Sequence, residues 1–470
     1  MPNDDSLIYT ARCRAARAWT AALRDGEGVS GAAFSAATAA WFILDKGGDS
    51  DSDRSRSRSL VENATAAGAV GGWPALLTAL SIPPFPLPLR GSDGGFTERS
   101  LVTRLPAILT ETLSSSGASP ALTASVQAFL IEPLERGMLL PPPEVDTARL
   151  WCAGADDAPI DWLWQEVCAY EHLLRLYVEH GVKDDPFSAQ KARALAAAEV
   201  SFLTHVAPMS SAAHPPDLRS ALAAALWGNR GDLSLSAGKV VDGAPLASAA
   251  SSDDALLVDE RDGALSALSQ AGSFARVIIV LDNCGAELLA DLVLADALLR
   301  AGVANVTLHA KIAPTFVSDA TVNDVWGTID WLCVAARTPA LAARLRAAGA
   351  AGSFLVESHA FWNAPRAGWE MPSDLLASLS RAHLAIFKGD ANYRRLLGDR
   401  HWPHFTPFNL VVGAYAPCPL LALRTCKAGL IVGVSPELEA RARALPEGGG
   451  SDAWLVSGYF GLAQFTLPTL

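Results

Sequence analysis

The stretch Val277-Ile-Ile-Val-Leu-Asp-Asn-Cys-Gly-Ala-Glu287 decides the fold of this chain of 470 residues. It opens with five consecutive apolar residues, which predict a strand buried on both faces, as in a parallel sheet. A turn then leads into a helical pattern that ends near Arg300. In open α/β sheets, ligands bind outside the carboxyl ends of such strands, where Asp282 and Asn283 lie. Their oxygen atoms suit Mg²⁺ or Mn²⁺, although Asp282 could instead cap the helix.

A second strand pattern, Val303–Ala310, follows that helix, and the segments together predict a right-handed βαβ unit. The two strands then end at the same rim of the sheet, and Asp319 falls on that rim. Two carboxylates and one amide oxygen there form a half-shell for a divalent cation, with room left for water and a substrate phosphate. The alternative for Asp319 is an N-cap role before a helix predicted from Thr321 to about Ala336.

A third unit repeats this layout, with a short strand at His383–Phe387 followed by the basic segment Lys388–Arg395. A tight turn there would open a short helix, whose first backbone N–H groups attract anions. Lys388, Arg394 and Arg395 add positive charge. For any one of these basic residues, the alternative is a solvated position paired with an acid.

A further apolar run ends at Lys427, with Arg424 three residues before it. In a strand, that spacing would point the two side chains to opposite faces of the sheet. A loop or a helical turn is therefore needed after Arg424 if both cations are to face one site.

Four blocks of this sequence carry a family resemblance: Val280–Glu287, Phe316–Asp319, Phe387–Arg394 and the Arg-Thr-x-Lys signature Arg424–Lys427. The chain resembles the metal-dependent damage-control phosphatases, in the sugar-phosphate phosphatase subfamily. The human member of that subfamily was also named an acidic-residue (protein-glutamate) O-methyltransferase. Weaker blocks, which include Arg104-Leu-Pro106 and Asp161–Glu166, extend the resemblance over most of the chain.

The resemblance implies roles residue by residue. Asp282, Asn283 and Asp319 match the family's metal ligands and are the expected catalytic centre. Under the methyltransferase interpretation, Glu287 also matches a position assigned to S-adenosylmethionine. The expected substrate-binding residues are Glu287, Lys388, Asp390, Asn392, Tyr393, Arg394 and Lys427. Arg395 is expected to lie outside the substrate contacts.

The resemblance implies a phosphatase that uses Mn²⁺ or Mg²⁺, with Co²⁺ or Ni²⁺ as alternatives. The implied substrates are small phosphometabolites such as fructose 1-phosphate and fructose 6-phosphate. Asp282 could act as a nucleophile or orient an attacking water, and the sequence leaves this open. Two other functions remain: an S-adenosylmethionine-dependent protein-glutamate O-methyltransferase, and a catalytically silent binding module. The single glycine in Leu281–Glu287 favours the phosphatase, because the usual turn for that cofactor is richer in glycine.

Composition restricts the partners and the compartment. A net charge of −12 argues against nucleic acid as a partner, because binding phosphate backbones needs a basic face. Seven cysteines without a Cys-x-x-Cys pair predict free thiols in a reducing compartment. Without a signal segment or a long apolar run, we expect a cytoplasmic protein without membrane contact, and a nuclear fraction stays open. The sequence gives no oligomeric state.

Two domains are predicted from the change in pattern along the chain. Residues 1–250 are expected to form a mostly helical domain, with a disordered polar loop at 49–59. Residues 251–470 are expected to form the α/β catalytic domain that binds the metal. Its alternation of strands and helices runs to about Val434. We therefore predict a three-layer α/β/α sandwich with a mainly parallel sheet, preceded by a helical domain that packs over its carboxyl rim.

Overall fold

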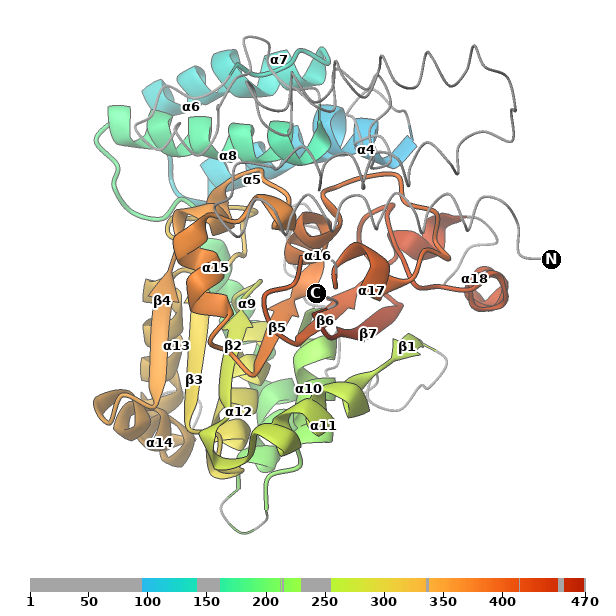
Figure 1. The fold of residues 1–470 in the computed structure, drawn as a ribbon. Helices are drawn as coiled ribbons and strands as arrows, with labels where there is room; N and C mark the ends of the chain where they lie inside the picture. Colours follow the sequence, from blue (N-terminus) through green and yellow to red (C-terminus); the bar gives the residue numbers. More distant parts are fainter. Residues whose placement is uncertain are drawn as a thin grey trace, which may run out of the picture.

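The computed structural model describes residues 95–141, 161–211, 213, 215–229, 255–334, 338–413, 415–446 and 452–468. The predicted loop at 49–59 lies outside them. At the centre is a seven-stranded sheet of order β1-β7-β6-β5-β2-β3-β4, in which only the β6–β7 pairing is antiparallel (Figure 1). The strands are β1 (Leu256–Asp259), β2 (Arg276–Val280), β3 (Asn305–Ala310), β4 (Phe354–Ser358), β5 (Leu384–Lys388), β6 (Leu420–Thr425) and β7 (Gly461–Thr466). The predicted mainly parallel sheet is confirmed.

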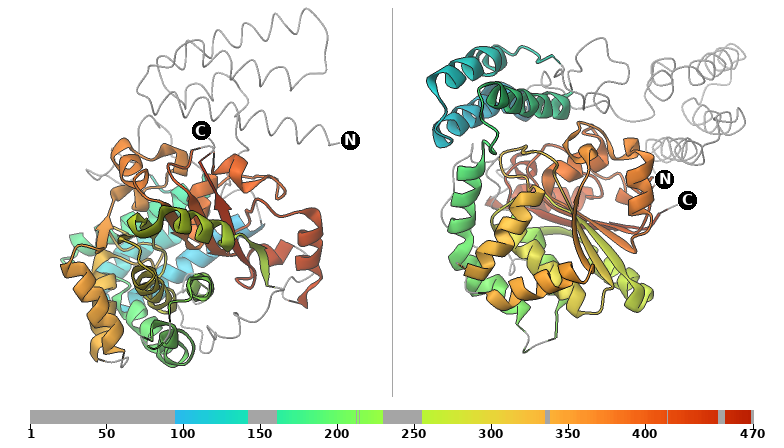
Figure 2. Two further views of the ribbon diagram at one scale, coloured as in Figure 1. Left: turned by 60° about the horizontal axis from the view of Figure 1, so that its bottom comes forward. Right: turned by 90° about the vertical axis from the view of Figure 1, so that its left-hand side faces the viewer.

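Strand β2 is buried on both faces, as its apolar run predicts. Val277 and Ile279 belong to one hydrophobic core, whereas Ile278 and Val280 belong to the other. Successive side chains of a strand point to opposite faces, so this division places one core on each side of the sheet. The predicted three-layer arrangement is therefore confirmed (Figure 2).

Each core is closed by its own layer of helices. The layer over Val277 and Ile279 consists of α9 (Ser188–Ser201), α10 (Leu218–Gly228), α11 (Arg261–Ala271), α12 (Ala286–Arg300), α13 (Val322–Val334) and α14 (Pro339–Ala350). The opposite layer consists of α15 (Ser373–Leu379), α16 (Gly389–Leu397), α17 (Phe408–Val411) and α18 (Pro436–Ala444). The predicted boundary at residue 250 stays a prediction, but α10 lies before it and packs against α12.

The remaining helices lie together at one end of the sheet, in blue to green in Figure 1. They are α4 (Gly95–Arg99), α5 (Leu105–Ser115), α6 (Pro120–Val126), α7 (Glu132–Glu135) and α8 (Trp162–Glu179), with π-helical turns at Ser100–Arg104 and Gln127–Ile131. The start of α8 reaches the helix layer that contains α16, because the Leu163 backbone N–H donates to Asp399 Oδ2 at 2.9 Å, just beyond α16. In the described part of the chain, no helix has the length and apolar character that a membrane span requires.

Candidate active site

Asp282 and Asp319 are brought together by backbone pairing. Asn283 and Asp319 form an isolated antiparallel bridge between the end of β2 and the loop after β3. Two backbone hydrogen bonds hold this bridge together. Cys284 N donates to the carbonyl oxygen of Ser318 at 2.7 Å, and Ala320 N donates to the carbonyl oxygen of Asp282 at 2.8 Å. The two carboxylates and the Asn283 amide are thus held next to one another by main-chain contacts.

The loop that delivers Asp319 is strained. Phe316 and Val317 have φ angles of 47° and 69°, in the left-handed region that bulky and β-branched residues avoid. Such strain costs about 1–3 kcal/mol per residue and persists only where the surroundings impose it. Here the bridge to Asn283 supplies that constraint.

Neither aspartate caps a helix. The N-cap residue of α12 is Gly285, and no side chain makes a capping hydrogen bond there. At α13, Thr321 and Asp324 cap each other, with Thr321 N donating to Asp324 Oδ2 at 2.9 Å and Asp324 N to Thr321 Oγ1 at 3.3 Å. The capping alternative therefore falls away for both Asp282 and Asp319.

The third unit meets the first at Asp390, which organises two basic residues. Asp390 Oδ1 accepts from Arg424 Nε at 2.7 Å and from the backbone N–H of Lys427 at 3.3 Å. Strand β6 ends at Thr425, so Lys427 lies in the loop that its spacing from Arg424 requires. The Lys427 ammonium group donates to the backbone oxygen of Asn229.

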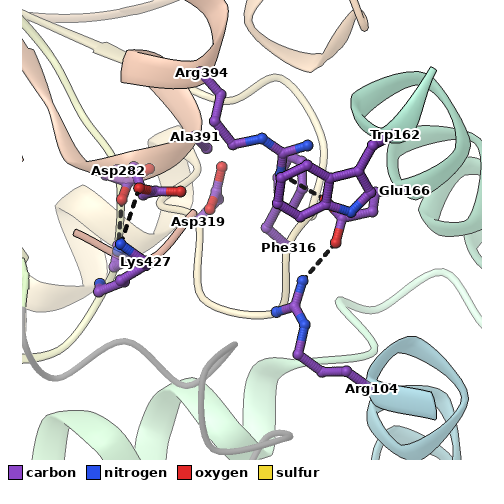
Figure 3. Close-up of a pocket in the computed structure, with 11 residues that line it drawn as sticks. Arg104, Trp162, Glu166, Asp282, Phe316, Asp319, Ala391, Arg394 and Lys427 are labelled. Atoms are coloured by element: carbon purple, nitrogen blue, oxygen red, sulfur yellow. Dashed lines mark hydrogen bonds and ion pairs between the residues drawn. The ribbon is translucent and has the colours of Figure 1, made fainter. Parts of the chain in front are cut away.

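These elements surround one pocket, shown in Figure 3. Six of the residues predicted for the site line it: Asp282, Asn283, Asp319, Asp390, Arg394 and Lys427. The other lining residues are Arg104, Trp162, Glu166, Phe316 and Ala391. The helical part of the chain thus forms one wall of the pocket, through Arg104, Trp162 and Glu166.

Four residues predicted to bind substrate do not line this pocket: Glu287, Lys388, Asn392 and Tyr393. Lys388 is fully buried and forms ion pairs with Glu287 at 2.7 Å and with Asp291 at 2.9 Å. Burial raises the pKa of Asp291 to about 7, although Lys388 opposes the shift. Asn392 Nδ2 donates to the Leu281 oxygen at 2.9 Å. These contacts support the floor of the site.

Tyr393 also faces away from the pocket. Its hydroxyl donates to Gln464 Oε1 at 2.8 Å, and its ring lies under the guanidinium group of Arg424. Burial raises the pKa of Tyr393, so the hydroxyl remains protonated and acts as a donor. It therefore helps to hold Arg424, which in turn binds Asp390.

Arg394 lines the pocket but is already shared between two acids. It donates to Glu166 Oε2 at 2.6 Å and to Asp399 Oδ1 at 2.8 Å, and its guanidinium carbon lies 3.6 Å from the Trp162 ring centroid. Glu166 also accepts from Arg104 at 2.5 Å. Burial acts to raise the pKa of Glu166, but Arg394 and Arg104 together lower it below its usual value. Glu166 is therefore an anion between two cations.

The sequence indicates no role for Lys311, and for Asn229 it leaves two alternatives open, a position facing the site or a role in a turn. Lys311 follows β3, and its Nζ lies 3.1 Å from Asp319 Oδ2. Asn229 Nδ2 donates to Asp282 Oδ2 at 3.0 Å. The strand-end rule that selected Asp282 could have found Lys311, whereas no local signal connects Asn229 with a strand that begins much later in the chain.

The donor set fits a hard divalent cation. Asp282, Asn283 and Asp319 are each at most 4% exposed and offer carboxylate and amide oxygens, which Mg²⁺ and Mn²⁺ prefer. In the part of the chain that the structure covers, no cluster of three or more His, Cys, Asp or Glu could hold a metal. A cation here would therefore have two carboxylates as ligands, with the amide oxygen of Asn283 available as a third.

Fold and site together define an α/β protein whose sheet rim combines a candidate cation cradle, formed by Asp282, Asn283 and Asp319, with lysine and arginine side chains. The chain belongs to the family of the damage-control phosphatase ARMT1-like domain, whose family model matches residues 98–441.

Curated relatives carry the name "Damage-control phosphatase ARMT1". The rat protein is 37% identical over 261 residues, which cover 52% of this chain and 57% of the relative. The human protein is 35% identical over the same length, and the zebrafish protein is 31% identical over 335 residues. This chain thus spans little more than half the length of its mammalian relatives. A solved DUF89 family protein from Pyrococcus horikoshii shares 14% identity, covers 77% of this chain and 96% of its own, and superposes with a TM-score of 0.42.

Proposed function

We propose that this chain is a divalent-metal-dependent phosphatase that hydrolyses small phosphometabolites. Its membership of the damage-control phosphatase family supports a phosphatase. The observation that carries the proposal is the Asn283–Asp319 bridge, which presents two carboxylates and an amide to a pocket that Lys427 also lines. An oxygen-rich cation site beside an ammonium group suits a phosphate ester, whose charge both would neutralise.

Asp282, Asn283 and Asp319 are the residues that would hold Mn²⁺ or Mg²⁺, with Co²⁺ or Ni²⁺ as alternatives. When bound, the metal would polarise the phosphoryl oxygen. Lys427 would bind the phosphate oxygens and stabilise the charge that develops on them. Its ammonium group is already oriented by the carbonyl of Asn229.

Arg394 is expected to contribute little net charge to phosphate binding. Two buried carboxylates, Glu166 and Asp399, balance its guanidinium group. Its contribution to phosphate binding is then mainly to shape the pocket wall together with Trp162. That Arg394 and Lys427 both bind substrate stays a prediction.

The organic part of the substrate would face the wall built by the helical segment. That wall combines the Trp162 ring with the polar groups of Glu166 and Arg104. An aromatic surface beside charged hydrogen-bonding groups suits a hydroxylated carbon chain. We therefore propose ketose phosphates, with fructose 1-phosphate and fructose 6-phosphate as the first candidates.

The methyltransferase alternative is disfavoured by the position of Glu287. Its side chain is 1% exposed, and its two oxygens accept from Lys388 at 2.7 Å and from Asn229 at 2.7 Å. A residue so engaged has little capacity left to bind a cofactor. A cation bound by Asp282, Asn283 and Asp319 would also have no evident role in methyl transfer.

The experiment is a phosphate-release screen over sugar phosphates, with EDTA or with added Mg²⁺, Mn²⁺, Co²⁺ or Ni²⁺. Asp319→Asn protein, purified in parallel, controls for contaminating phosphatases because it keeps the size of the side chain. We expect metal-dependent release that the variant lacks. A methyl-transfer assay is run on the same preparations. Methyl transfer without any phosphate release would overturn the proposal in favour of the methyltransferase.

A further inference from the structure

The C-terminal end of α10 is buried at the rim of the sheet, next to the cation cradle. The last carbonyl groups of a helix lack partners within the helix and attract positive charge. Two lysines supply it here: Lys388 Nζ donates to the Ala225 oxygen at 2.7 Å, and Lys427 Nζ donates to the oxygen of Asn229. The helix end thus holds one lysine from the end of β5 and one from the loop after β6.

The side chain of Asn229 uses its full hydrogen-bonding capacity at the same place. Its Nδ2 donates to Asp282 Oδ2 at 3.0 Å and to Glu287 Oε2 at 2.7 Å. Its Oδ1 accepts from the Thr425 backbone at 3.2 Å and from the Thr425 hydroxyl at 2.6 Å. Asn229 is fully buried. An amide with two donors and two acceptors meets these four demands, whereas a carboxylate lacks the donors.

Asn229 therefore acts on both charges of the site. The amide groups of Asn229 and Asn283 both donate to Oδ2 of Asp282, which fixes the rotation of that carboxylate. The backbone carbonyl of Asn229 holds the Lys427 ammonium group, and the bonds to Thr425 fix the position of that carbonyl. The cation ligand and the phosphate-binding lysine are linked through one residue.

We propose that Asn229 is a positioning residue that sets Asp282 and Lys427 in one fixed relation, so that cation and phosphate bind side by side. This inference rests on the proposed phosphatase function. Groups that orient metal ligands from outside the coordination sphere typically contribute about ten- to a hundredfold to metal affinity. Asn229 differs from such groups because it also orients the Lys427 ammonium group, which would bind the phosphate.

The test uses the full chain and measures Mn²⁺ affinity directly, from the electron paramagnetic resonance signal of free Mn²⁺. Asn229→Leu keeps the number and branching of the side-chain heavy atoms and removes the side-chain hydrogen bonds. We expect its dissociation constant for Mn²⁺ to rise by about ten- to a hundredfold. The inhibition constant for inorganic phosphate should rise as well. Unchanged affinity for both would overturn the proposal.

Gln165→Met is the matched control. Gln165 is also buried, and its amide bonds the backbone of Leu140 at both ends. Its loss should lower the unfolding temperature but leave Mn²⁺ affinity as in the wild type. If Gln165→Met weakened Mn²⁺ binding as much as Asn229→Leu, the effect would be general loss of packing, and the proposal would fail.

If circular dichroism shows that Asn229→Leu does not fold, Thr425→Val decides. It removes the hydroxyl that donates to Asn229 Oδ1 and should weaken Mn²⁺ binding by about two- to fivefold, the value of one hydrogen bond. Unchanged affinity in this variant would overturn the proposal. Failure of the phosphatase function itself looks different, because the wild-type protein would then neither bind Mn²⁺ nor release phosphate.

Discussion

Gly389 leaves the space that the carboxylate of Asp282 occupies. A Cβ atom at Gly389 would lie 1.7 Å from Asp282 Oδ2, and the residue has a φ angle of +76°. The first residue of α16 is therefore glycine for two reasons, backbone conformation and room for the acid. The turn after β5 and the acid after β2 fit together at the rim of the sheet.

Gly389→Ala should displace Asp282 and remove phosphatase activity. The combined cost of backbone strain and overpacking should lower the free energy of unfolding by about 2–5 kcal/mol. Gly352→Ala is the control, because Gly352 has the same φ of +76° with nothing within 4 Å of its added Cβ. It should cost about 1–2 kcal/mol and keep full activity. Urea unfolding and phosphate release measure both, and equal activity losses would contradict the steric argument.

Metal binding should stabilise the fold through Asp282. At a Mn²⁺ concentration a hundred times the dissociation constant, the free energy of unfolding should rise by about 2.7 kcal/mol. EDTA should abolish this gain together with the activity, and Asp282→Asn should show neither. Asp296→Asn serves as the control, since Asp296 is a buried acid held by Arg344 at 2.6 Å. A Mn²⁺-induced thermal shift that persists in Asp282→Asn would contradict the assigned ligand.

Lys427→Ala should lower kcat/KM by about 2–4 kcal/mol of transition-state stabilisation. Lys427 lines the pocket, and its ammonium group donates to the backbone oxygen of Asn229. Lys183→Ala, at an exposed position, should change nothing and controls for net charge. Comparable losses in both variants would mean that overall charge, and not contact with the phosphate, sets the rate.

Arg395, which is predicted to lie outside the substrate contacts, has a structural role. Arg395 is 1% exposed and donates to the carbonyl oxygens of Trp362 at 3.0 Å and Ala364 at 2.9 Å. Arg395→Ala would leave two buried carbonyls unsatisfied, at roughly 1–3 kcal/mol each. We expect lower stability in urea, with the remaining folded protein close to wild type in KM.

His309 should make the fold sensitive to acid. Burial, with a smaller contribution from His359, lowers the pKa of His309 to about 4 from an ordinary value of 6.5. The unfolded chain therefore binds the proton first, so the contribution of His309 is complete above pH 6.5 and is lost as pH falls towards 4. The loss should reach roughly 3 kcal/mol. In His309→Phe, the unfolding free energy should fall less steeply over this range, and an unchanged slope would refute the assignment.

The sequence predicts the central βαβ unit well because its signals are local. The apolar run 277–281, the helix after Gly285 and the acids at the strand end follow from short-range periodicity and one topological rule. The rest depends on contacts between distant segments. Strand β7 lies beyond the predicted end of the alternation near Val434 and pairs antiparallel with β6, which no local pattern indicates.

The candidate site shows the same division. Asp282, Asn283 and Asp319 were selected by their places after strands, and the bridge between them agrees with that choice. Lys388 has the appearance of a substrate-binding lysine in the sequence, but Glu287 and Asp291 neutralise it inside the protein. Tertiary packing decides whether a charged side chain faces a ligand or is neutralised by a buried partner. The residue type alone does not distinguish these two cases.

The position of β7 has a consequence for synthesis of the protein. Leu256 of β1 pairs with Gly461 of β7, which then pairs with β6. These partners are separated by about 200 residues, which a ribosome translating 5–20 residues per second takes roughly 10–40 s to add. During that interval β1 has no partner strand, whereas β6 is an open edge only for roughly the last 2–7 s, because it is translated shortly before β7. Closure of this side of the sheet therefore waits until β7 has been translated, and until then the exposed edge is a natural target for chaperones.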